Sequence, residues 1–154
     1  LVVHAFGKIT LFFAAGAIYT AAHKTDVSQL NGIGRRMPWT MSAFTIAALS
    51  LIGIPPAAGF VSKWFILGSA VDGHHAYVLA ALFASTLLNA AYFLPIVHAA
   101  FFRKADAGDE LHLHGEAPWP MVLALMTTAA LTVALFFYST PLVQMAGRLV
   151  ANHY

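Results

Sequence analysis

The sequence predicts an all-α fold: a polytopic transmembrane helix bundle of about four spans, one of them discontinuous. Three observations predict it. Hydrophobic residues make up 60% of the 154 residues and charged residues only 9%, whereas an ordinary soluble domain is roughly 25% charged. The apolar residues gather into long segments with short polar loops between them. The longest segment carries two adjacent prolines near its middle, which a continuous helix does not accommodate.

The apolar segments are predicted to be helices, because an open sheet would leave its edge groups without hydrogen bonds in lipid. A span needs about 20 mostly apolar residues. We expect a membrane domain over residues 1–140 and a short C-terminal tail over 141–154. Within the membrane domain the expected spans are residues 1–22, 38–73 (broken), 76–102 and 117–140.

The segment 38–73 allows two interpretations. Its 36 residues are more than one straight helix needs to cross a bilayer, so it is either two short spans or one span broken in the middle. The polar loops 23–37 and 103–116 both carry Lys or Arg, and the turn 72–76 carries neither. The positive-inside rule places both basic loops on the cytoplasmic face. This favours one broken span.

The predicted break contains residue types that interrupt a helix. Pro55 and Pro56 each lack a backbone N–H and clash with the preceding turn, and Gly53 and Gly59 on either side allow the chain to unwind. The freed backbone groups must face protein or water, never lipid. Lys63 follows one turn later, although a lysine at the centre of a span costs roughly 2.5–3.5 kcal/mol on insertion scales. A buried functional lysine is favoured over one that snorkels to a membrane surface.

A second pair of proton-exchanging side chains lies in the first segment. His4 and Lys8 are four residues apart, so they share one helical face with roughly 5–6 Å between their Cβ atoms. Histidine titrates nearest neutrality, and lysine, unlike arginine, can lose its proton inside a protein. The pair is either a proton relay deep in the membrane or a polar mouth at the end of the helix.

A polar stripe crosses the middle of the segment 76–102. Ser85, Asn89 and Tyr92 follow one another at positions i, i+4 and i+7. Such a stripe is typical of hydrogen bonding between transmembrane helices, with a transport path as the alternative.

Several classes of function are disfavoured. The basic residues are scattered and do not alternate with aromatic residues, so we expect no nucleic-acid partner. There is no cysteine, which excludes disulfides, thiolate metal sites and thiol nucleophiles. No glycine-rich phosphate loop or zinc-protease helix motif is present. We therefore expect no cofactor and no metal.

Three stretches of the sequence resemble a known family: "HAFGKITLFFAAGAIY", "DVSQLNGIGRRMPWTMSAFTIAALSLIGIPPAAGFVSKW" and "LLNAAYFLPIVHAAFF". They resemble the proton-conducting, antiporter-like membrane subunits. That family includes the large membrane subunits of respiratory complex I (NADH:quinone oxidoreductase), the D-type Mrp Na⁺/H⁺ antiporter proteins, and the membrane subunits of membrane-bound hydrogenases. The resemblance extends to about residue 103, and its motifs are the His–Lys pair, "GIGRRMP", "GIPP" and "GFxSK" in this order.

The resemblance implies a fold with inverted repeats, each with one discontinuous helix, of which this chain looks like a C-terminal fragment. It implies that Lys63 is the key lysine of a discontinuous helix and that His4 and Lys8 lie on a central relay stripe. The implied function is translocation of protons, or Na⁺/H⁺ antiport, by a multi-pass subunit of the inner (plasma) membrane. Its partners would be other membrane subunits of a respiratory, antiporter or hydrogenase complex; the subunit itself would be a transporter. The alternative is a structural membrane subunit that only scaffolds such a complex.

Overall fold

The computed structural model describes residues 2–104, 115–141 and 144. This part of the chain is helical and contains no strand, which confirms the predicted fold class. The expected tail, 141–154, lies almost entirely outside the described residues. The elements are α1 (Val2–Ala22), the 3₁₀ helix η1 (Val27–Leu30), α2 (Ile33–Arg36), α3 (Pro38–Ile52), α4 (Ala58–Asp72), α5 (Ala76–Phe102) and α6 (Trp119–Phe137).

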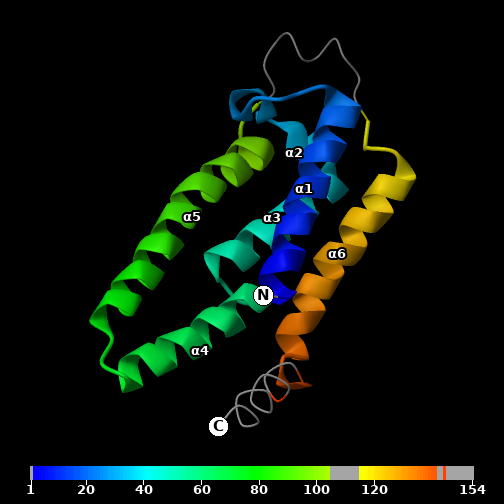
Figure 1. Cartoon of the computed structure of the whole chain (residues 1–154). Helices are drawn as coiled ribbons and strands as arrows, with labels where there is room; N and C mark the ends of the chain where they lie inside the picture. The colour runs from blue at the N-terminus through cyan, green and yellow to red at the C-terminus, as the bar shows by residue number, and fades with distance from the viewer. Residues whose placement is uncertain (1, 105–114, 142–143, 145–154) are drawn as a thin grey trace.

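Helix α3 lies at the centre of the bundle. It packs against α1, α5 and α6, and α1 also packs against α6; Figure 1 shows α1 lying across α3, with α5 and α6 on either side. Small side chains at these contacts let the helix backbones approach closely, as is common between membrane helices. The fully buried small residues include Ala14, Ala17, Ala43, Ala47 and Ala129.

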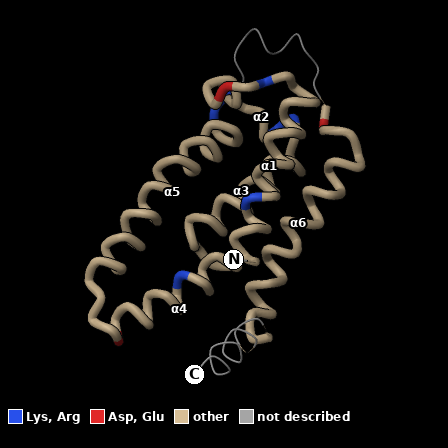
Figure 2. Tube along the Cα trace, viewed as in Figure 1, with Lys and Arg blue, Asp and Glu red and all other residues tan. Residues whose placement is uncertain are grey.

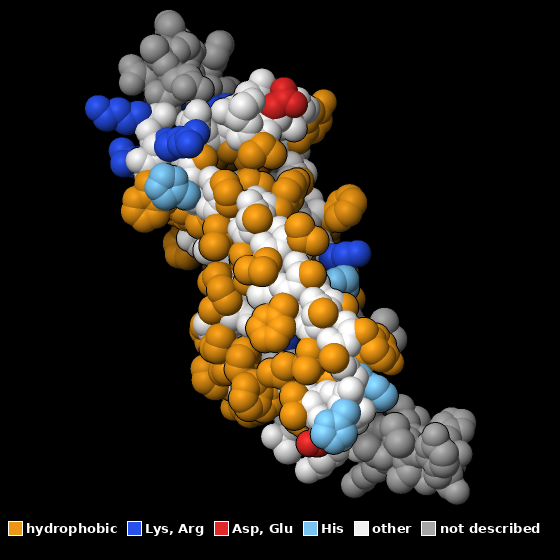
Figure 3. Space-filling view, turned by 90° about the vertical axis from the view of Figure 1, so that its left-hand side faces the viewer, with side chains coloured by type: hydrophobic (Ala, Val, Ile, Leu, Met, Phe, Trp, Pro, Cys, Tyr) orange, Lys and Arg blue, Asp and Glu red, His pale blue; other side chains and the backbone are white. Residues whose placement is uncertain are grey.

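The outer surface of the bundle exposes many large apolar side chains. On α5, Phe83 is 64% exposed and Leu88 is 70% exposed, and Figure 3 shows hydrophobic side chains covering most of one face of the molecule. Soluble monomers rarely expose continuous apolar patches of this extent. In a bilayer, however, such side chains face lipid. Three helices, α1, α5 and α6, are long and apolar enough to cross a membrane.

Helices α3 and α4 are the two parts of the segment predicted to form one broken span. Each has 15 residues, or about 22 Å of helix, which is less than the roughly 30 Å of a hydrocarbon core. Figure 1 shows α4 continuing away from the end of α3 toward the far end of the bundle. The predicted break in the helix over residues 38–73 is therefore present, since α3 ends at Ile52 and α4 begins at Ala58.

The basic loops lie at one end of the bundle. Figure 1 shows η1, α2, the end of α5 and the start of α6 at the same end, and the turn between α4 and α5 at the opposite end. Figure 2 shows most of the Lys and Arg positions gathered at the first end, with one further basic position on α1 and one on α4. This arrangement is the one expected for a single broken span. Among the described residues, Lys8 and Lys63 are the only Lys or Arg residues within the five long helices α1, α3, α4, α5 and α6.

An acidic side chain ties the first turn of α3 to the chain leading into α6. The carboxylate of Glu116 accepts hydrogen bonds from the backbone N–H groups of Trp39 (3.2 Å) and Thr40 (3.1 Å) and from the Thr40 hydroxyl. These N–H groups have no partner within the helix, and a negative charge is favourable at a helix N-terminus. Glu116 therefore supplies the cap that α3 lacks in its own sequence.

Candidate functional site

The site is built around the broken end of α3. Gly53 adopts the left-handed conformation, with φ of 88°, and its N–H donates to the carbonyl of Leu49 at 2.9 Å. Glycine is the residue that takes this conformation at a helix C-terminus without strain. The Ile54 N–H bonds to the same carbonyl at 3.0 Å. Pro55 and Pro56 follow and offer no donor, so the helix ends where the prolines predict.

The first turn of α4 lies directly against the last turn of α3. The Gly59 N–H donates to the hydroxyl oxygen of Ser50 at 3.1 Å. A Cβ atom added at Gly59 would lie 1.7 Å from the Ser50 carbonyl oxygen, far inside van der Waals contact. Only glycine permits this approach, which brings the start of α4 beside the carbonyl end of α3.

Lys63 extends back from α4 to the end of α3. Its Nζ donates to the carbonyl of Ile52 and to the hydroxyl oxygen of Thr86, both at 2.8 Å. Its methylene stem covers Gly53, where an added Cβ would lie 2.6 Å from the Lys63 Cδ. A cation is favourable at a helix C-terminus, where the last carbonyls have no partner in the helix. No carboxylate of the described residues pairs with Lys63, so its partners are both neutral.

Helix α5 provides further polar groups to the same end. Thr86 and Asn89 lie three positions apart on one face, and the Asn89 side-chain amide donates to the carbonyl of Leu51 at 3.4 Å. Of the expected stripe, only Asn89 thus bonds to α3. Ser85 is exposed, and Tyr92 is 62% exposed with its ring edge-on to that of Phe93.

Two residues of this site were not singled out by the sequence. Thr86 follows Ser85 directly in the sequence. The predicted stripe joined Ser85 to Asn89 at i, i+4, whereas a stripe that joined Thr86 to Asn89 at i, i+3 would have identified Thr86. Ser50 is a hydroxyl three residues before Gly53, in the last turn before the predicted break. A search for hydroxyl side chains next to a helix break would have found Ser50.

A cavity opens beside the ammonium group. It measures about 200 Å³ and lies between α4 and α5, with Lys63, Thr86 and Gly53 in its lining. One water molecule needs only about 10–15 Å³ in this measure, so the cavity has room for several. The remaining lining residues are apolar or aromatic: Phe60, Trp64, Leu67, Leu82 and Phe83.

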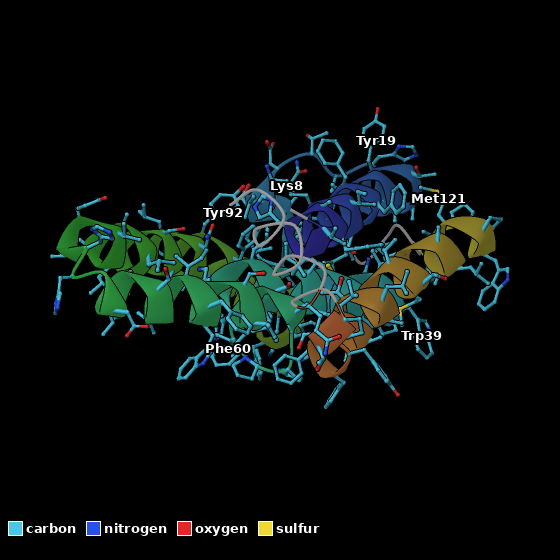
Figure 4. The ribbon with its side chains drawn as sticks, turned by 60° about the horizontal axis from the view of Figure 1, so that its bottom comes forward. Lys8, Tyr19, Trp39, Phe60, Tyr92 and Met121 are labelled. Carbon is cyan, nitrogen blue, oxygen red and sulfur yellow. The ribbon has the colours of Figure 1, made fainter. Side chains whose placement is uncertain are left out.

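His4 and Lys8 lie on α1 and do not line this cavity. Both are exposed, and Figure 4 shows Lys8 on the outer side of α1. The neighbouring Gly7 is buried, and a Cβ added there would lie 3.5 Å from the Leu51 side chain. Lys8 is therefore at the depth of the end of α3, as Lys63 is. No hydrogen bond among the described residues joins His4 or Lys8 to Lys63.

These features define a class of protein. The chain is a polytopic helical membrane protein in which a lysine within a discontinuous span bonds to the exposed carbonyl end of the first half-helix. Residues 1–104 match the family described as NADH:quinone oxidoreductase/Mrp antiporter, transmembrane. The chain belongs to this family, as its motifs predict.

The chain is similar to subunits of NADH-quinone and NADH-ubiquinone oxidoreductases. It is 27% identical to NADH-quinone oxidoreductase subunit N of Desulfitobacterium hafniense, over 95% of this chain and 29% of that protein. It is 38% identical to NADH-ubiquinone oxidoreductase chain 5 of Cryptococcus neoformans, over 86% of this chain and 21% of that protein. The chain thus spans less than a third of the length of these relatives.

Solved structures of the same architecture come from three kinds of complex. The Mrp complex from Dietzia sp. matches with a TM-score of 0.84 over 97% of this chain and 36% of that chain, and at 22% identity this likeness shows the fold alone. The archaeal membrane-bound sulfane sulfur reductase matches with 0.73 at 28% identity, over 88% of this chain and 22% of that chain. Respiratory complex I from Thermus thermophilus matches with 0.60 at 26% identity, over 85% and 31%.

Proposed function

We propose that this chain forms part of a proton-translocating membrane subunit, with Lys63 as a proton carrier. One observation carries the proposal: an ammonium group inside a span is held by two neutral oxygen atoms and opens onto a cavity with room for water. The family and its relatives support it, since they are membrane subunits of NADH:quinone oxidoreductases and of an Mrp complex. The subunit would work with other membrane subunits, in the inner (plasma) membrane of a cell.

The geometry around Lys63 suits a group that gains and loses a proton. A carboxylate partner would hold the ammonium form by a strong charge–charge interaction, whereas Ile52 and Thr86 hold it only by hydrogen bonds. Ion-coupled transporters use the carbonyl ends of broken helices to bind cations. In this chain the cation at the carbonyl end of α3 is the ammonium group of Lys63. The ion that moves would therefore be the proton. Exchange of protons for Na⁺ would be an activity of the whole subunit.

Lys8 and His4 would relay protons toward the other part of the subunit. Both are exposed on one face of α1, and Lys8 lies at the depth of the helix break. A lysine facing hydrocarbon at that depth would cost roughly 2.5–3.5 kcal/mol, which supports a polar or hydrated surface against this face of α1. Two proton-exchanging groups one helical turn apart can pass a proton with small side-chain movements.

Substitution of Lys63 by arginine tests the proposal. Arginine keeps the positive charge and the donors for the Ile52 carbonyl, but it does not deprotonate in proteins. Lys63→Arg in the full-length protein, purified with its complex and reconstituted into vesicles, should assemble normally and lose proton transport as severely as Lys63→Ala. In the same assay, Lys8→Ala should slow transport while assembly remains intact. Near-normal pumping by Lys63→Arg would overturn the proton-carrier assignment.

A structural role is the second candidate, and one observation favours it. The Lys63 ammonium caps the C-terminus of α3, and a capping cation stabilises a helix whether or not it titrates. In a scaffold subunit this is all that Lys63 would do. Arginine would then be tolerated, and Lys63→Ala would lower stability and assembly. The same pair of variants therefore separates the two functions.

A further inference from the structure

The two partners of the Lys63 amine differ in their chemistry. The Ile52 carbonyl can only accept a hydrogen bond, so it serves an N–H of either the ammonium or the neutral amine. The Thr86 hydroxyl both accepts and donates. It accepts from the ammonium at 2.8 Å, and by rotating its hydrogen it can donate to the lone pair that appears when the proton leaves.

No other lining residue that the structure describes can do both. Among the described residues that line it, the only polar side chain apart from Lys63 and Thr86 is Trp64, whose indole N–H donates but does not accept. No acidic or histidine side chain of the described part of the chain lines this cavity. On the same face of α5, the Asn89 side-chain amide donates to the carbonyl of Leu51. Thr86 is thus the one side chain in the lining that matches the amine in both of its protonation states.

The position of the amine is also determined by its surroundings. The Lys63 stem lies across Gly53, with no room for a Cβ between them, so the amine reaches the gap between the end of α3 and the side of α5. Both oxygen atoms are within 2.8 Å of Nζ. Without the Thr86 hydroxyl, the amine would keep a single protein partner on α3 and none on α5.

We infer that Thr86 is a positioning residue for proton exchange at Lys63. Its hydroxyl holds the Lys63 amine in the same place whether the amine is protonated or neutral, so that the proton can leave and return without the side chain relocating. This inference rests on the proposed function, because it concerns the same lysine. The inference adds Thr86, on α5, to the residues proposed to act in proton exchange. It states that this exchange requires the hydroxyl group of Thr86 and not the volume of its side chain.

Two substitutions separate the hydroxyl from the volume. Valine has nearly the shape of threonine without the oxygen, and serine keeps the oxygen without the methyl group. Removal of a hydrogen bond to a charged group is expected to slow proton transport by about tenfold or more. In the full-length protein, purified with its complex and reconstituted into vesicles, Thr86→Val should show this loss, and Thr86→Ser should retain most of the transport rate.

Thr127→Val is the matched control. Thr127 lies within α6, is exposed, and its hydroxyl bonds only to the Leu123 carbonyl of its own helix at 2.7 Å. Its substitution should leave transport unchanged. A residue that acts only by packing would give the reverse order at position 86, with valine tolerated and serine impaired. That order, or equal transport by Thr86→Val and Thr86→Ser, would overturn the inference.

Assembly is measured for every variant. If Thr86→Val does not assemble, Thr86→Cys takes its place, because a thiol is a weak donor and a weak acceptor. Slower transport by Thr86→Cys than by Thr86→Ser supports the inference. Equal transport by these two variants overturns it. The Lys63→Arg result keeps the two proposals apart. If Lys63→Arg loses transport and Thr86→Val transports normally, only the inference about Thr86 is rejected, and the proposal that Lys63 carries protons stands. If Lys63→Arg transports normally, the proposal that Lys63 carries protons is rejected.

Discussion

Gly59 is expected to be the position where the smallest change does the most damage to the broken span. Its missing side chain lets the first turn of α4 contact the backbone of α3 at Ser50. A Cβ in Gly59→Ala would lie 1.7 Å from the Ser50 carbonyl oxygen, and such contacts are essentially never shorter than 3.0 Å. The start of α4 must therefore retreat by at least 1.3 Å, the difference between these two distances. The obstacle is backbone, so no side-chain rotation can relieve the contact.

The free-energy cost of Gly59→Ala can be estimated from this geometry. Overpacking at a tight site typically costs about 1–3 kcal/mol. The Gly59 N–H bond to the Ser50 hydroxyl would lengthen, with a loss of about 1 kcal/mol. Alanine regains roughly 0.5–1 kcal/mol within a helix. We expect a net destabilisation of about 1–3 kcal/mol from these three contributions, together with a shift of the Lys63 amine away from the Ile52 carbonyl.

Gly68→Ala is the control, because it makes the same chemical change in the same helix. A Cβ at Gly68 meets nothing within 4 Å, so this variant should be as stable as the parent or slightly more so. The measurement is thermal unfolding of the purified full-length protein in detergent, with proton transport in vesicles as a second readout. Equal unfolding temperatures and equal transport for Gly59→Ala and Gly68→Ala would refute the close approach of α4 to α3.

Two further predictions follow from the bundle. Single cysteines introduced at Asn31 and Lys104 should react with an impermeant thiol reagent from the same side of the membrane. A cysteine introduced at Gly73 should react from the other side. Labelling of positions 31 and 104 from opposite sides would contradict the single broken span. Glu116→Gln should lower stability by about 1 kcal/mol at low salt, because it removes the negative charge at the N-terminus of α3. Salt screens this interaction, so the difference in unfolding temperature should shrink as salt is added; a difference that does not depend on salt would count against the electrostatic cap at Thr40.

The sequence by itself determined the membrane class, the long apolar helices and the break. Apolar length is a local property, because a helix must satisfy its own backbone and cross a layer of known thickness. Pro55, Pro56 and Gly53 interrupt the helix through their own backbone chemistry, whatever surrounds them. The unequal distribution of Lys and Arg favours one broken span over two, a prediction that the cysteine labelling tests. The motifs around Lys63 and the His4–Lys8 pair were enough to indicate the family.

Only the tertiary structure decided which groups meet. The sequence shows that α5 carries Ser85, Thr86 and Asn89, but the rotation of that helix about its axis decides which of them faces α3. That rotation depends on how whole surfaces pack, and a stripe at i+4 and a stripe at i+3 are equally consistent with helical periodicity. The cap of α3 by Glu116 joins residues 76 positions apart, and no local pattern specifies it. Lys63 was recognisable as an unusual cation, but its two neutral partners became visible only when the end of α3 and the side of α5 were placed beside it.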